Sequence, residues 1–249
     1  MEQVNVVNDA ETTTLASAVF LSVDHIVVAA RTLAEGVAWC ESTLGITPGP
    51  GGKHAFMGTH NRVFSIASAR FPRTHLEIIA IDPAALAPAR TRWFDLDDPA
   101  MQAALERGPQ LIHWVARCDD VQAAVLAMLA DDIDRGEVLQ AERPTTHGAL
   151  RWRISVRADD RRLFDGALPT LIQWGDVHPA DGMPDSGVSL ERVTLAGLPQ
   201  AVEDLLPATV AIDRDRHAAP ISVVLQTPAG AIDLALLDPV SAGCRAASR

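Results

Sequence analysis

The sequence predicts an α+β protein made of two paired βαβββ modules whose curved sheets surround a pocket, plus a third partial βαβββ-like module. Three observations support this prediction. A strand-like apolar run opens each half of the chain, a helical spacing of apolar residues follows each run, and three more short strands follow each helix. A repeated order of elements indicates duplicated units. Pairing two modules buries their apolar faces and leaves a concave space between them.

The first module is predicted over residues 21–82, after a flexible lead, residues 1–20. The lead contains no Lys or Arg, so it lacks the positively charged start of a signal peptide. Thr32 and Glu35 form a capping-box pattern behind the opening strand. The helix that they start carries apolar residues about 3.6 positions apart until Gly45 ends it. The later strands are predicted at about residues 54–58, at 62–69 and around Glu77.

A connector, residues 83–108, is rich in proline and acidic residues and includes a short helix at 99–106. The second module is predicted over residues 109–178 and repeats the order of the first. Asp120 caps its helix and Gly136 follows the helix end. Its elements are a strand at 110–117, a helix at 120–134 and strands at 137–143, 149–157 and 169–174.

A third, partial module is predicted over residues 187–238. Its elements are a strand at 188–196, a helix at 199–206 and strands at 208–213, 220–227 and 230–237. Arg192 lies where the first two modules carry histidine, and Asp233 lies near their acid or amide position, so this pair could form a salt bridge or a substrate clamp. Residues of the metal-ligand type are absent there. We therefore interpret this part as a structural unit that extends the sheet, within one compact molecule.

Composition excludes several classes of partner. The chain has 249 residues, 48% of them hydrophobic, and a net charge of −11, which argues against nucleic acid or an anionic membrane surface. No apolar run approaches the roughly 20 residues that span a bilayer. Three widely spaced cysteines form neither a disulfide framework nor a zinc motif. We expect a cytoplasmic protein with a small-molecule substrate, and the sequence leaves open whether it forms a homodimer.

Polar residues interrupt equivalent apolar runs of the two modules. His25 and His113 lie in the first strands, and Glu77 and Gln173 lie in the last strands. Buried polar groups need partners, and two facing modules bring four such groups to one place. Two imidazoles and two oxygen donors are the ligands of a divalent metal site.

Several stretches resemble the vicinal oxygen chelate superfamily, which includes glyoxalase I, extradiol dioxygenases, methylmalonyl-CoA epimerase and the fosfomycin- and bleomycin-resistance proteins. The first is D-H-I-V-V at Asp24, followed by the helix T-L-A-E-G-V-A-W-C-E-S-T-L-G. The second, G-K-H-A-F-M-G-T-H-N from Gly52 to Asn61, precedes L-E-I-I-A-I-D. The third is L-P-T-L-I-Q-W, residues 168–174. The similarity covers residues 20–237 and is strongest to the glyoxalase-like domain proteins.

The resemblance implies a metal centre and a class of reaction. Position by position, the superfamily's ligands fall on His25, Glu77, His113 and Gln173. They would hold Zn, Mn, Ni, Co or Fe and leave positions open for a small, oxygen-rich organic substrate. A metal-dependent lyase or isomerase follows as the expected activity. Two alternatives stay open, an Fe(II) extradiol-type dioxygenase and a non-catalytic binding or resistance protein of the same fold.

The general base is not identified by the resemblance. Glyoxalase I has a glutamate at the fourth ligand position, whereas Gln173 cannot accept a proton at neutral pH. The candidates by residue type are the histidines His54, His60, His75 and His147. Strand alternation places Trp114 and Trp174 on the face opposite to the neighbouring candidate ligands.

Overall fold

The computed structural model describes residues 3–6, 20–145 and 148–235. The first module begins with β2 (Ser22–Ala29), and the Thr32 hydroxyl caps the helix that follows by accepting the Glu35 N–H at 3.2 Å. Gly45 ends this helix with a φ of 75°, a conformation that favours glycine. The remaining elements are α1 (Leu33–Leu44), β3 (Lys53–His54), β4 (Thr59–Ser65) and β5 (His75–Ile81).

The second module repeats this order. The Asp120 carboxylate caps its helix by accepting the Ala123 N–H at 3.0 Å. The helix ends at Leu129, earlier than predicted, in a turn where Asp132 has a φ of 60°. The elements are β6 (Gln110–Arg117), α3 (Val121–Leu129), β7 (Glu137–Thr145), β8 (Gly148–Val156) and β9 (Thr170–Trp174).

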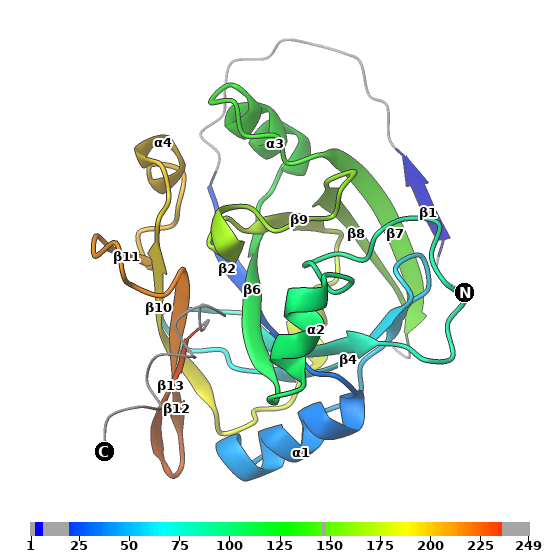
Figure 1. Ribbon diagram of the computed structural model, residues 1–249, viewed down its shortest axis with the longest axis vertical. Coiled ribbons are helices and arrows are strands. Elements are labelled where there is room, and N and C mark those ends of the chain that lie inside the picture. Colours follow the sequence, from blue (N-terminus) through cyan, green and yellow to red (C-terminus); the bar gives the residue numbers. More distant parts are fainter. Residues whose placement is uncertain (1–2, 7–19, 146–147, 236–249) are drawn as a thin grey trace.

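The two modules share one curved sheet. The first strands of the modules, β2 and β6, pair antiparallel at its middle, and each pairs in parallel with the last strand of its own module, β5 or β9. Within the predicted lead, β1 (Gln3–Val6) pairs with β7 at one edge. The strand order is β1-β7-β8-β9-β6-β2-β5-β4-β3. The predicted fold class, α+β with paired βαβββ modules that form curved sheets around a pocket, is confirmed, and the two modules share a single sheet (Figure 1).

The pairing of β2 with β6 contains two irregularities that decide which side chains reach the concave face. One lies between Val23 and His25, where Asp24 is the extra residue, and the other lies opposite Val27 and Val28, where Ile112 of β6 is the extra residue. An extra residue in a strand turns two consecutive side chains to the same face. Asp24 and His25 therefore both leave the apolar core that Val23 and Ile26 share on the convex side.

The third unit forms a sheet of its own, so the expectation that it extends the main sheet was wrong. Its order is β11-β10-β12-β13. Side chains of this sheet share one apolar core with the convex side of β2 and β6, as Val193 and Val223 do with Trp114. Figure 1 shows it standing beside the main sheet. The elements are β10 (Ser189–Ala196), α4 (Gln200–Glu203), β11 (Ala211–Asp213), β12 (Ile221–Thr227) and β13 (Gly230–Ala235).

The connector packs against the concave face. Before α2 (Pro99–Leu105), Trp93 and Phe94 are buried against residues of both modules. Two ion pairs fasten this segment to the second module, with the Arg162 Nε–Asp95 Oδ2 and Arg90 Nε–Asp160 Oδ2 distances both 2.8 Å.

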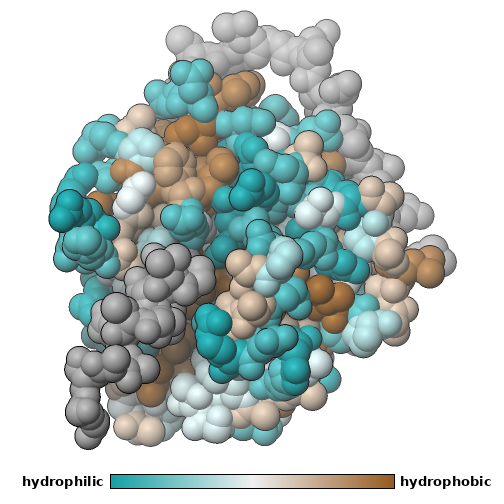
Figure 2. Space-filling model, viewed as in Figure 1, coloured by the Kyte–Doolittle hydropathy of each residue, from teal (hydrophilic) through white to brown (hydrophobic). Residues whose placement is uncertain are grey.

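The molecular surface that faces the viewer in Figure 2 is mostly hydrophilic, with apolar side chains gathered over the region of α3. Leu126 and Leu129 of α3 are among the exposed large hydrophobic residues. In the described part of the chain, no helix is long and apolar enough to cross a bilayer. Cys40 and Cys118 are buried free thiols, and burial raises the pKa of each to about 12.

Candidate metal centre and pocket

The concave face carries a pocket of about 630 Å³, a volume that includes its open mouth. Apolar and aromatic side chains form most of its lining, with a few polar groups among them, as is typical of small-molecule sites. The aromatic members are Trp93, Phe94, Trp152 and Trp174. The polar and charged members are His25, His54, Asn61, His75, Glu77 and Arg143.

Asp24 fixes the orientation and tautomer of His25. The Nδ1–H of His25 donates to Asp24 Oδ1 at 2.6 Å, because a carboxylate can only accept. When the ring is neutral, it presents its Nε2 lone pair, and this nitrogen lies 3.6 Å from Glu77 Oε2. Burial opposes charging of His25, but Asp24 and Glu77 outweigh it and raise the pKa. A carboxylate behind an imidazole is a recurrent arrangement around protein metal ligands.

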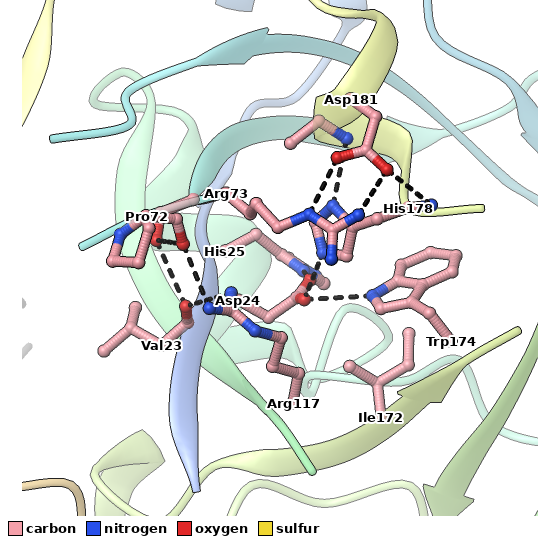
Figure 3. A network of polar contacts seen from close by, with 12 residues as sticks. Val23, Asp24, His25, Pro72, Arg73, Arg117, Ile172, Trp174, His178 and Asp181 are labelled. Atoms are coloured by element: carbon pink, nitrogen blue, oxygen red, sulfur yellow. Dashed lines mark hydrogen bonds and ion pairs between the residues drawn. The ribbon is translucent and has the colours of Figure 1, made fainter. Parts of the chain in front are cut away.

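The other oxygen of Asp24 accepts two further hydrogen bonds (Figure 3). Trp174 Nε1 and His178 Nε2 each donate to Asp24 Oδ2 at 2.9 Å. Burial favours the neutral acid, yet the hydrogen bonds from His178 and His25 lower the pKa of Asp24 below its usual range. His178 caps the short turn Pro179–Gly182, whose Asp181 pairs with Arg73. Asp24 is thus a buried anion whose two oxygens hydrogen bond to His25, Trp174 and His178 and fix their positions.

Asn61 performs a similar role for Glu77. Its Nδ2 donates to Glu77 Oε1 at 2.6 Å, so Oε2 is left facing His25. The Asn61 side-chain carbonyl accepts the Gly52 N–H at 2.6 Å, which fixes the amide orientation. In the described part of the chain, no Lys or Arg forms an ion pair with Asp24 or Glu77. Two buried carboxylates without a fixed cation favour an added positive charge.

His75 adds a nitrogen donor to this centre. Its ring stacks on that of His25 with centroids 4.7 Å apart, and its buried Nδ1 has no hydrogen-bond partner. Burial and the neighbouring His25 lower the pKa of His75 to about 3, so the ring is neutral. Ligand atoms of Asp24, His25 and His75 lie within 4.8 Å of one another and could hold a metal ion. Glu77 is outside that group and approaches the centre through His25, with its Oε2 3.6 Å from His25 Nε2. Asp24 already accepts three hydrogen bonds, so His25, His75 and Glu77 carry the donor atoms that have no such commitment.

The glycine-rich loop builds the rim of the pocket. A Cβ at Gly51 would lie 2.0 Å from the Asn61 carbonyl oxygen, and one at Gly52 would lie 1.7 Å from Arg143 Nη1. The first glycine allows the backbone to approach β4, and the second makes room for a guanidinium in the pocket. His54 of this loop hydrogen bonds to Thr59 and Asn61, and burial lowers its pKa to about 4.

The structure brings His25 and Glu77 together and directs the other two predicted ligands elsewhere. His113 lies on the same face, but its Nδ1 donates to the Gly166 carbonyl at 3.1 Å and its Nε2 accepts the Thr170 N–H at 3.1 Å. Gln173 faces α3, where its Oε1 accepts the Val121 N–H at 3.2 Å.

Strand register explains the position of Gln173. Val27 pairs with Glu77 in the first module, and the equivalent Val115 pairs with Thr170 in the second. Thr170 is therefore the counterpart of Glu77. Side chains alternate along β9, and Trp174 lies on the side of the pocket, so the expectation that Trp174 faces away was wrong. Trp114, in contrast, does lie in the convex core.

The candidate bases are dispersed. His54 and His75 line the pocket, whereas His60 is on the other side of β4, with its Nδ1 3.9 Å from Asp82 Oδ1. His147 lies outside the described residues. Sequence reasoning missed Asp24, whose position beside His25 in an apolar run was the available signal. It also missed residues for which the sequence held no signal, namely Trp93, Phe94, Arg143 and His178.

One solved structure shares this fold over most of its length, and others match parts of the chain. A structure of a hypothetical protein from Staphylococcus aureus is similar over 87% of this chain and 86% of that one, with 14% identity and a TM-score of 0.54. Methylmalonyl-CoA epimerase from Mycobacterium tuberculosis matches with 13% identity over 65% of this chain and 91% of its own, at a TM-score of 0.38. Methylmalonyl-CoA epimerase from Streptomyces coelicolor, in complex with 2-nitronate-propionyl-CoA, matches with 17% identity over 64% of this chain and 98% of its own, at a TM-score of 0.39. No curated protein matches the chain.

Paired βαβββ modules around a concave polar centre define the fold of the vicinal oxygen chelate superfamily. Within that superfamily, the profile described as "Glyoxalase-like domain" matches residues 23–210. The chain belongs to the glyoxalase-like domain family.

Proposed function

We propose that this protein is a divalent-metal-dependent enzyme of the lyase or isomerase type that acts on a small, oxygen-rich organic molecule. The observation that carries the proposal is the pair formed by His25 and Glu77. The Nε2 lone pair of His25 and the free Oε2 of Glu77 lie 3.6 Å apart, each held by a second residue behind it.

The donor set fits a divalent ion. His25, His75 and Glu77 offer two nitrogens and one oxygen, which suit Zn, Mn, Ni, Co or Fe. The buried, unpartnered Nδ1 of His75 is a donor that a cation would satisfy. We propose these three as ligands, with Asp24 and Asn61 as positioning residues and with His113 and Gln173 holding the second module. A bound ion would supply Lewis acidity toward a carbonyl or vicinal oxygens.

The chain's own residues would bind and orient the substrate. Trp152 and Trp174, with ring centroids 5.8 Å apart, give an apolar wall for its carbon skeleton. Arg143 is a permanent cation in the pocket and suits a carboxylate or another anionic group of the substrate. His54 is a neutral imidazole in the pocket that lies outside the proposed ligand set, which makes it the candidate for proton transfer.

Metal binding tests the proposal directly. Chelator-treated protein would be reloaded separately with each of the five metals, and bound metal per chain would be measured by elemental analysis. We expect one ion per chain and at least tenfold weaker binding in Glu77→Gln. Glu142→Gln is the control, because Glu142 pairs with Arg151 at the surface. Absence of stoichiometric metal in the wild type, or unchanged binding in Glu77→Gln, would contradict the metal centre.

The donor types also favour one alternative reaction. Two imidazoles and one carboxylate are the ligands of many non-haem Fe(II) oxygenases. Oxygen uptake with catechols by iron-loaded protein would support a dioxygenase. Proton exchange at a carbon next to a carbonyl, followed by NMR in deuterated water, would support the lyase or isomerase type. Tight ligand binding by metal-free protein without turnover would favour the binding protein and contradict both enzymes.

A further inference from the structure

A second cavity lies beside the first, within the second module. It is a small cavity, and the volume of about 340 Å³ includes the open solvent at its mouth. Trp93 and Phe94 line both cavities. The lining includes His113 and Thr170, the counterparts of His25 and Glu77. It also includes four arginines, an unusual concentration of positive charge in a chain whose net charge is −11. They are Arg135, Arg157, Arg161 and Arg162.

Arg135 is the residue that makes this cavity informative. Its side chain is buried, with 3% of the residue exposed, and its Nε and Nη1 have no hydrogen-bond partner. Its Nη2 makes a long contact, 3.4 Å to the Thr170 hydroxyl oxygen. Burial lowers the pKa of Arg135 to about 10, so the group is still a cation at neutral pH. A buried charge with unpaired donors is strongly unfavourable unless a ligand completes it.

The carboxylates around the cavity are already neutralised. Asp95 pairs with Arg162, and Asp160 pairs with Arg90. Arg157 is held by Asp159 at 2.8 Å and lies 3.7 Å from Asp134. In the described part of the chain, no carboxylate forms an ion pair with Arg135. Asp134 acts on Arg135 through space without forming an ion pair, so the guanidinium donors inside the cavity have no carboxylate partner.

The divergence of the two modules accounts for this charge. Where the first module has the carboxylate of Glu77, the second has the neutral hydroxyl of Thr170 beside Arg135. An acid at position 170 would neutralise the guanidinium, and threonine leaves it available. The two modules thus differ at this position, and the second has a guanidinium whose donors suit an anion.

We propose that this cavity is a binding site for a small oxyanion, a phosphate or carboxylate group, with Arg135 as its principal donor. Arg157 lies at the same cavity and adds positive charge, and the exposed Arg161 draws anions toward the mouth. Guanidinium donors match the oxygens of both anions. The site does not depend on the metal centre, from which Trp93 and Phe94 separate it.

Thermal unfolding and calorimetry with inorganic phosphate and with acetate, each at ionic strength matched with sodium chloride, test the site. At ten times the dissociation constant, the bound anion should raise the melting temperature by about 4 °C. A larger effect of phosphate assigns a phosphoryl ligand, and a larger effect of acetate assigns a carboxylate. No effect of either anion beyond that of chloride overturns the proposal.

The variant Arg135→Met separates binding from structure. It removes an unpaired buried charge, so we expect it to melt no lower than the wild type without anion and to bind the anion at least tenfold more weakly. Arg107→Met is the control, because Arg107 is exposed and donates to the Ala103 carbonyl. If Arg135→Met does not fold, Arg135→Lys serves instead, with several-fold weaker binding expected because donors are lost. A wild-type response in the folded variant overturns the assignment.

Discussion

Asn61 holds Glu77 by one oxygen, with Nδ2 2.6 Å from Oε1, and so leaves the other oxygen to His25. The same amide is fixed from behind by the Gly52 N–H. This contact joins the glycine-rich loop to the last strand of the first module, and it makes the carboxylate geometry depend on a neutral side chain.

Replacing Asn61 with aspartate should therefore set two carboxylates against each other. The Gly52 contact is retained, but like charges at this distance destabilise the metal-free protein by about 2–4 kcal/mol at alkaline pH. Part of that loss should return as the pH falls, because the two acids then share a proton. Urea unfolding at both pH values measures the effect. Asn61→Ala, which lacks the second charge, is the control, and an equal pH response in the two variants would contradict the interpretation.

Asp24→Asn should weaken metal binding while leaving the ligands in place. The asparagine amide can donate to His25 Nδ1, which would place the hydrogen on Nε2 and remove the lone pair that faces Glu77. Loss of such a supporting carboxylate lowers metal affinity by about 10–100-fold. A competition titration with a chelating dye measures it. Asp181→Asn, which alters an exposed pair with Arg73, should bind metal like the wild type; equal affinities in all three proteins would refute the role of Asp24.

His113 should make stability depend on pH. Burial, with help from the charges of Arg135 and Arg162, keeps its pKa well below the ordinary value of 6.5, so the folded ring is neutral. The unfolded chain binds a proton there below about pH 6.5 and the folded chain does not. The free energy of unfolding therefore falls as the pH drops below 6.5, by up to about 1.36 kcal/mol per pH unit from this residue. His113→Gln should show a shallower slope in urea unfolding, and an unchanged slope would count against a neutral His113.

Two adjacent glycines should respond differently to alanine. At Gly51 the new Cβ meets the Asn61 backbone carbonyl at 2.0 Å, so the strand must move, and we expect a loss of about 2 kcal/mol or more. At Gly52 the Cβ meets the end of the flexible Arg143 side chain, which can swing away, so we expect a loss below about 1 kcal/mol. Urea unfolding distinguishes them, and equal losses would show that the contact with Arg143 is as rigid as backbone.

The sequence was sufficient for the order of elements, the duplication and the pairing of His25 with Glu77. It was not sufficient for side-chain direction where both faces of a strand are buried. In β9, Leu171 and Ile172 are equally apolar and both buried, so the pattern does not show which of the two alternating sets of side chains faces the pocket. Because of this ambiguity, the sequence predicted Gln173 in the site and Trp174 on the opposite face.

Other features depend on contacts between distant segments. The irregularity at Asp24 arises from pairing with β6, and alternation alone would separate Asp24 from His25. Trp93 and Phe94 belong to a connector whose path over the concave face leaves no periodic pattern. Arg135 follows an ordinary acidic turn, and its burial depends on strands and loops that the local sequence does not reveal.

The continuous ladder from β5 through β2 and β6 to β9 limits how this protein can move. Backbone hydrogen bonds join the two modules in the middle of the sheet, so the modules cannot open by a hinge motion. Opening of the pocket must therefore come from movement of the segments that line its mouth, which are the connector with Trp93 and the turn that His178 caps. Small molecules would then enter and leave as these loops move, while the strands under the pocket keep their positions.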